Sequence, residues 1–174
     1  MRIGGNFGGG SGAGADPREA PEPDIYEAVI CLIEPVGKHK ERNDPDRSKE
    51  KVCIGFELEW RNSKGQREIL FRKHTLGLWK SPDGTKATDF RVLLDTVFPD
   101  KVAGILAAGG EIETNDWVGR QVRVQVETDA RGRAIIKGVM RSKKDGTPEA
   151  MRAERDCSQP FGLWKWLIEN QERA

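Results

Sequence analysis

The chain has 174 residues, of which 36% are hydrophobic and 33% are charged, and its formal net charge is +1 at pH 7. This length fits one domain with tails, and so high a charged fraction places some segments outside a packed core. A net charge this close to zero excludes a uniformly basic surface, so a site for a polyanion has to come from a local cluster of charges.

The three cysteines, Cys31, Cys53 and Cys157, are odd in number and widely spaced, which favours free thiols in a reducing compartment over a disulfide framework. The first residues lack the apolar run of a signal peptide. No stretch approaches the roughly 18 apolar residues that cross a bilayer. We therefore expect a protein of the cytoplasm, or of a virion interior, with no membrane partner.

Residues 1–24 contain seven glycines and three prolines, and Ile3 and Phe7 are their only large apolar side chains. Glycine raises the entropy of the unfolded chain, and no apolar pattern offsets it here. The composition predicts a flexible arm. Two readings stay open for it: plain disorder, and an arm that becomes ordered on a partner or a neighbouring subunit.

The first two predicted strands follow this arm. Residues 25–33 form a short, nearly continuous apolar run, which predicts a buried strand. The charged residues 38–51 then predict an exposed loop. Residues 52–60 alternate large apolar residues with small or acidic ones, so we expect a strand with one core face. On its other face, Glu57 and Glu59 are interpreted as a solvated surface.

Turn residues define two hairpins. Residues 62–65 (Asn-Ser-Lys-Gly) supply turn chemistry, and a strand over 68–76 completes the first hairpin. Residues 120–128 alternate valines with polar residues, residues 129–132 form a turn, and residues 134–140 return as the partner strand. The sequence thus predicts five short strands.

A helical insertion separates the third and fourth predicted strands. Thr88 suits an N-cap, Pro99 ends the helix, and a second short helical piece covers residues 100–108. The apolar residues of the first piece recur at helical spacing: Phe90, Leu93, Leu94 and Val97. Five strands with this insertion predict a mainly β fold, an oligonucleotide-binding-like (OB-like) barrel over residues 25–142, since closure removes exposed strand edges.

Two further segments follow the predicted barrel. Residues 143–157 are polar and predict a linker, whereas residues 158–174 contain two tryptophans and predict an amphipathic helix capped by Ser158. So short a helix is unstable alone in water, so it has to dock. Its docking site is open between the barrel itself, a neighbouring subunit and another protein such as a replication protein.

Catalytic and metal-binding patterns are missing from the sequence. His39 and His74 lie on different predicted elements, and no paired-cysteine motif accompanies them. No serine elbow, cysteine–histidine pairing or phosphate-cradling glycine loop occurs. We expect no catalytic residues, no metal, no cofactor and no enzymatic activity.

A basic cluster is the strongest functional signal. Between residues 117 and 144, eight basic residues are opposed by two acidic ones. A phosphate backbone favours such a stripe because each neutralised phosphate releases counterions. The alternative is a merely soluble hairpin. The predicted phosphate contacts are Arg120, Arg123, Arg133 and Lys137, with Arg123 and Lys137 expected to share one sheet face.

The third predicted strand and the loop after it add a second set of candidates. Basic groups interleaved with aromatic rings bind single-stranded nucleic acid, because bases stack on the rings while cations follow the phosphates. Phe71 and Trp60 could equally belong to the core. The predicted contacts here are Arg72, Lys73, His74 and Trp79.

Five short motifs, each of low specificity, occur in an order that resembles a known family. They are Val36-Gly37, Phe56-Glu57-Leu58, Lys73-His74-Thr75-Leu76, Leu93-Leu94 and Gly119-Arg120-Gln121-Val122. Over about residues 25–142 the chain is similar to phage-encoded proteins related to single-stranded-DNA-binding proteins. The resemblance implies an OB-like barrel that acts in replication or recombination of a phage or mobile element, in the host cytoplasm. Residues 169–174 depart from the acidic tail usual in better-known single-strand binders.

These observations predict a non-catalytic protein that binds single-stranded DNA, or RNA, with little sequence preference. The rival interpretation is a structural or adaptor β-barrel that binds other proteins, in a virion or an assembly. It draws on the glycine-rich arm and the tryptophan-rich residues 158–174, both of which could reach a neighbour or form a homo-oligomer.

Overall fold

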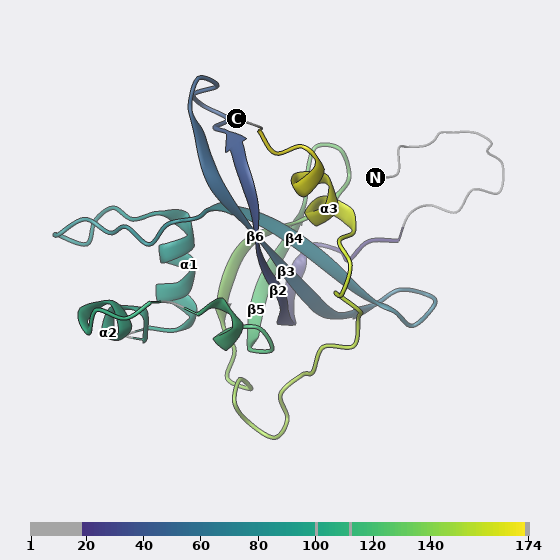
Figure 1. Cartoon of the computed structure of the whole chain (residues 1–174). Helices are drawn as coiled ribbons and strands as arrows, with labels where there is room; N and C mark the ends of the chain where they lie inside the picture. The colour runs from purple at the N-terminus through teal and green to yellow at the C-terminus, as the bar shows by residue number, and fades with distance from the viewer. Residues whose placement is uncertain (1–18, 100, 112, 173–174) are drawn as a thin grey trace.

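The structure of the chain, a computed structural model, describes residues 19–99, 101–111 and 113–172 (Figure 1). The predicted arm at residues 1–24 therefore lies mostly outside the described residues. The fold is mainly β, as predicted. Within the described residues, its strands form one antiparallel five-stranded sheet in the order β4-β3-β2-β5-β6, and three α-helices and a 3₁₀ helix accompany it. The strands are β2 (Asp24–Lys40), β3 (Ser48–Arg61), β4 (Arg67–Thr75), β5 (Gln121–Thr128) and β6 (Ala134–Arg141).

The hairpin of β2 and β3 is longer than the sequence predicts. β2 continues through Pro35 and Gly37 to Lys40, so the expected loop over residues 38–51 is wrong and shrinks to residues 41–47. The register shifts between Pro35 and Gly37, and Gly37 has a φ of 80°. A bulge accommodates both a proline without an N–H and a positive φ, so neither residue ends the strand.

The turns of the two shorter hairpins, β3–β4 and β5–β6, are held by the same pattern of hydrogen bonds. The Oδ1 atom of Asn62 accepts hydrogen bonds from the amides of Lys64 and Gln66, at 2.9 and 3.0 Å. The Oδ1 atom of Asp129 accepts from the amides of Arg131 and Arg133, both at 2.9 Å. A glycine of positive φ stands three residues after the Asn or Asp in each turn, as such turns require. The predicted hairpins are thus confirmed.

The sheet has two edge strands that come close together. β4 and β6 contact each other, but within the described chain the hydrogen-bonded pairing stops at these two strands. The five-stranded antiparallel sheet is therefore established, whereas the closed barrel is not.

The main core lies on one face of the sheet beneath α1 (Asp89–Val97). Phe56, Leu58 and Val124 from the strands meet Phe90 and Leu94 from the helix, and all of these are almost fully buried. Thr88 caps α1 as predicted, since its side chain accepts a hydrogen bond from the amide of Arg91. α2 (Lys101–Ala107) and the 3₁₀ helix η2 (Thr114–Asp116) follow before β5.

A second, smaller core lies on the opposite face, beneath α3 (Gly162–Glu169) (Figure 1). Trp164 and Leu167 of this helix pack against Leu32, Cys53 and Ile69 of the sheet. The helix thus docks on the sheet of its own chain, one of the three possibilities left open by the sequence. It begins at Gly162, so the predicted cap at Ser158 is wrong. The amide of Ser158 instead donates to Asp156.

Residues 142–161, yellow-green in Figure 1, have no regular structure, and residues 152–155 of this segment lie against β3 and β4. Glu57 is fully buried and holds this segment: it accepts hydrogen bonds from Arg67 and from the amides of Glu154 and Arg155 at 2.7–3.1 Å. The interpretation of Glu57 as a solvated surface residue is therefore wrong. Neighbouring Glu59 is exposed, as expected.

Candidate functional site

The structure separates the eight predicted contact residues into two groups. The first group lies on β4 and in the loop before α1. Arg72 and His74 point to the core face of the sheet, because they pair with Ile54 and Val52, whereas Lys73 between them faces the other way. These three side chains consequently do not share one surface.

His74 is 2% exposed, and its Nδ1 atom lies 3.3 Å from a carboxylate oxygen of Asp89. Its ring also packs against Phe90. Arg72 is half-buried, and this burial lowers the pKa of its guanidinium. Trp79 is 58% exposed and is the one aromatic ring of this group that a nucleobase can reach.

The second group lies on and beside the hairpin of β5 and β6. Arg123 pairs across the hairpin with Met140, while Lys137 occupies the bulge where the register shifts. The two exposed cations therefore do not face each other in register as the sequence suggests. At the turn, Arg133 forms an ion pair with Asp129 at 3.0 Å.

Arg120 forms an ion pair with a carboxylate of its own chain. Its guanidinium binds both carboxylate oxygens of Asp145, with distances of 2.6–3.1 Å, and the amide of Gln121 donates to the same carboxylate. Burial pushes the pKa of Asp145 upward, but these hydrogen bonds and the nearby charges of Arg120 and Lys101 outweigh it, so the pKa lies below its ordinary value. The pair fixes the turn at residues 142–145 against the start of β5.

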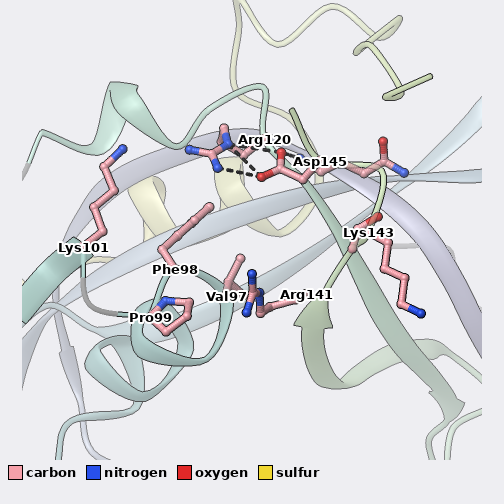
Figure 2. Close-up of a pocket in the computed structure, with 10 residues that line it drawn as sticks. Val97, Phe98, Pro99, Lys101, Arg120, Arg141, Lys143 and Asp145 are labelled. Atoms are coloured by element: carbon pink, nitrogen blue, oxygen red, sulfur yellow. Dashed lines mark hydrogen bonds and ion pairs between the residues drawn. The ribbon is translucent and has the colours of Figure 1, made fainter. Parts of the chain in front are cut away.

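A pocket beside this ion pair gathers four cationic side chains, Lys101, Arg120, Arg141 and Lys143 (Figure 2). We call it the basic pocket. Its volume is about 410 Å³, and it lies between the end of α1, the start of α2 and the adjoining ends of β5 and β6. Its lining consists of Val97, Phe98, Pro99, Lys101, Arg120, Gln121, Arg141, Ser142, Lys143 and Asp145.

The pocket has four cationic side chains and one carboxylate. Arg120 and Asp145 neutralise each other, whereas Lys101, Arg141 and Lys143 form no ion pair within the described part of the chain. Unpaired cations around a concavity raise the local concentration of anions. The basic pocket can therefore hold an anion without first breaking a salt bridge.

Aromatic stacking supports the apolar wall of the pocket. The guanidinium carbon of Arg120 lies 4.7 Å from the ring centroid of Phe98, and Phe98 stacks on Trp117 at 5.9 Å with an interplanar angle of 21°. Trp117 is completely buried. The pocket wall is thus anchored in the main core, so its shape does not depend on a loose loop.

Sequence reasoning identified only part of this site. Arg141 and Lys143 belong to the basic cluster seen in the sequence, but they were not among the predicted contacts. Lys101 lies 40 residues before Arg141, on a different element, so charge counting along the chain could not have joined it to them.

The comparisons with known proteins add no relative. No protein family, curated protein or solved structure matches this chain. Among the described residues, no set of three or more His, Cys, Asp and Glu side chains is placed to bind a metal ion. The described helices are all too short or too polar to cross a bilayer.

Proposed function

We propose that this chain is a non-catalytic protein that binds single-stranded nucleic acid, DNA in the first instance, through the β5–β6 hairpin and the basic pocket. The observation that carries the proposal is the group of exposed cations around β5, β6 and the pocket that form no ion pair with a carboxylate among residues 19–99, 101–111 and 113–172. These are Lys101, Arg123, Lys137, Arg141, Lys143 and Lys144.

The strand order supports the same function. An OB-like barrel arises when the outer strands of an order such as β4-β3-β2-β5-β6 come together, with a helix between the third and fourth strands in sequence. β4 and β6 already contact each other, and α1 occupies that place between β4 and β5. We propose that the sheet curves into such a barrel.

Binding by unpaired cations has a defined salt dependence. Each phosphate contact with a single strand releases condensed counterions, so the logarithm of affinity falls by about 0.7 per contact for each unit of the logarithm of salt concentration. Base identity has little influence on this interaction. A role in replication or recombination of a phage or mobile element follows from the family resemblance and forms part of the proposal.

A salt-dependent anisotropy titration with a labelled single-stranded oligonucleotide tests the proposal. The double variant Arg123→Ala/Lys137→Ala removes two expected phosphate contacts and should lower the salt slope by about 1.4. The variant Lys64→Ala, at the exposed turn between β3 and β4, removes the same kind of charge elsewhere and should leave the slope as it is. Absence of binding at low salt would sink the proposal.

A protein-binding adaptor is the second candidate function, favoured by the outer face of α3. Leu163 is 40% exposed and Trp166 is 55% exposed, one helical turn apart. The double variant Leu163→Ala/Trp166→Ala separates the two functions. Loss of an assembly, with oligonucleotide binding absent from the unsubstituted protein, would favour the adaptor.

A further inference from the structure

We propose that the basic pocket binds a phosphate monoester, which could be the terminal phosphate of an oligonucleotide or the phosphate of a free nucleotide. For oligonucleotides, this inference rests on the proposed function. For nucleotides it rests on the pocket alone. Two features of the pocket carry it, namely its charge and its volume.

The charge of the pocket matches a dianion. The bidentate pair of Arg120 and Asp145 is internally neutral, so the surplus comes from Lys101, Arg141 and Lys143. A phosphodiester within a strand carries one negative charge, whereas a phosphate monoester carries about −1.5 to −2 at neutral pH. Three cations around one concavity therefore favour the monoester over an internal phosphate.

The volume of the pocket leaves room beside a phosphate group for the sugar that carries it. Its volume of about 410 Å³ falls in the range of small-molecule sites, roughly 300–1,000 Å³, and exceeds what a phosphate group alone would fill. Val97, Phe98 and Pro99 give the remaining space an apolar wall, against which the attached sugar can pack (Figure 2).

Asp145 is a positioning residue in this arrangement. It ties the turn that carries Lys143 to Arg120 and to the amide of Gln121. The same contact keeps the Arg120 guanidinium over Phe98. One carboxylate thus holds two cations at the rim of the pocket while its own charge is neutralised.

The pocket also continues the surface proposed for the strand. Arg141 is the last residue of β6 and lies opposite Val122, and its carbonyl oxygen accepts a hydrogen bond from Arg123 at 3.1 Å. A strand bound along Arg123 and Lys137 can therefore place its end beside Arg141.

Three versions of one oligonucleotide test this inference: unphosphorylated, 5′-phosphorylated and 3′-phosphorylated. Each phosphorylated version carries its fluorophore at the end opposite the phosphate and is compared with the unphosphorylated version labelled at that same end. We expect one phosphorylated version to bind on the order of tenfold more tightly, which corresponds to about 1.4 kcal/mol. The double variant Lys101→Ala/Arg141→Ala should reduce this ratio to about one. The single variant Lys143→Glu should do the same, and Lys64→Ala should leave the ratio unchanged.

Free ligands distinguish the two sources of the phosphate. Deoxyadenosine monophosphate should raise the Tm of the full chain and deoxyadenosine should not, with inorganic phosphate as a third arm. Equal binding of all three oligonucleotides, together with no shift by the monophosphate, would overturn the inference and leave the proposed function intact. A shift by the monophosphate without any oligonucleotide binding would support the pocket and reject the proposed function. Circular dichroism confirms that each variant is folded.

Discussion

Glu57 shows how a residue far from the proposed binding surface can organise the molecule. It lies in a strand whose alternation is plain in the sequence, and Glu59 two residues later is exposed. Only the three-dimensional structure reveals that residues 152–155 cross over Glu57 and donate two backbone amides to it, beside Arg67. Backbone amides leave no trace in a pattern of side chains, so the sequence could not indicate this burial.

Replacing Glu57 by glutamine should destabilise the protein by roughly 3 kcal/mol, since removing one partner of a buried ion pair leaves the other uncompensated. The side chain of Arg67 is only 12% exposed, but it retains a contact with Glu154 at 3.0 Å, which keeps the cost at the lower end. Urea denaturation measures the change. Glu59→Gln is the matched control and should stay within about 0.5 kcal/mol of the unsubstituted protein.

Asp145 gives the stability of the protein a dependence on pH. Its pKa is lowered in the folded state, because the hydrogen bonds from Arg120 and Gln121 outweigh the opposing effect of burial. The folded state therefore favours the carboxylate. This contribution is complete above the unfolded pKa of about 3.9 and is lost as the pH falls through the lower folded value.

The variant Asp145→Asn should consequently be less stable by about 1–2 kcal/mol at pH 7, a modest value because the ion pair is partly solvated. The difference from the unsubstituted protein should stay constant down to about pH 5 and shrink below about pH 4. Urea denaturation at a series of pH values measures it. A difference that widens on acidification would contradict the assignment.

At the scale of elements, the sequence predicted the strands, turns and helix start that depend on residues close together in the chain. A continuous apolar run located the first strand and alternation located others, Asn62 and Asp129 located the turns, and Thr88 located the start of α1. The sequence-based prediction failed where pairing between strands extends a strand beyond the residues that end its apolar run. The first strand is predicted to end at residue 33, but hydrogen bonding to β3 carries β2 past Pro35 and Gly37 to Lys40.

The two neighbouring tryptophans of α3 offer a direct test of its docking. Trp164 is 6% exposed in the second core, whereas Trp166 is 55% exposed on the outer face. Trp164→Ala should cost about 3–5 kcal/mol of the free energy of unfolding, or as much as docking of α3 is worth if the helix detaches first. Trp166→Ala should cost no more than about 0.5 kcal/mol. Thermal denaturation with limited proteolysis of residues 142–172 measures both, and equal effects would argue against the docked helix.

At the scale of the whole molecule, closure of the five-stranded sheet into a barrel depends on its two edge strands. β2 is the central strand and pairs on both sides, whereas β4 and β6 each have one hydrogen-bonded neighbour in the described sheet. An edge without a partner exposes backbone N–H groups to water. Closure of the sheet would change that exposure, and with it the rate of amide exchange.

Hydrogen exchange should therefore be slowest in the central part of β2, at residues 28–33, and faster at the outward-facing amides of β4 and β6. Mass spectrometry after pulse labelling measures the gradient. Equal protection of β4, β6 and β2 would show that the edges are hydrogen-bonded to each other in solution, as in a closed barrel.

The candidate site was predictable only in part. Clustering along the chain is enough to mark the basic hairpin, because its cations lie close in sequence. The basic pocket needs Lys101 from α2 and Arg141 from β6 to line the same concavity, and it needs Asp145 to neutralise Arg120. His74 shows a prediction that failed for the opposite reason. The sequence of β4 suggests a basic and aromatic binding surface, but the fold buries the side chain of His74.

The docking of α3 on the outer face of β2, β3 and β4 also affects how the chain folds as it is synthesised. All five strands have been made once residue 141 is complete, whereas α3 begins at Gly162. Until then, Leu32, Cys53 and Ile69 lack the helix that buries them. Because segments emerge from the ribosome in order, the nascent sheet presents an apolar face for the time needed to translate the intervening residues. A chaperone that binds apolar surfaces would find its target in that interval, before the second core can close.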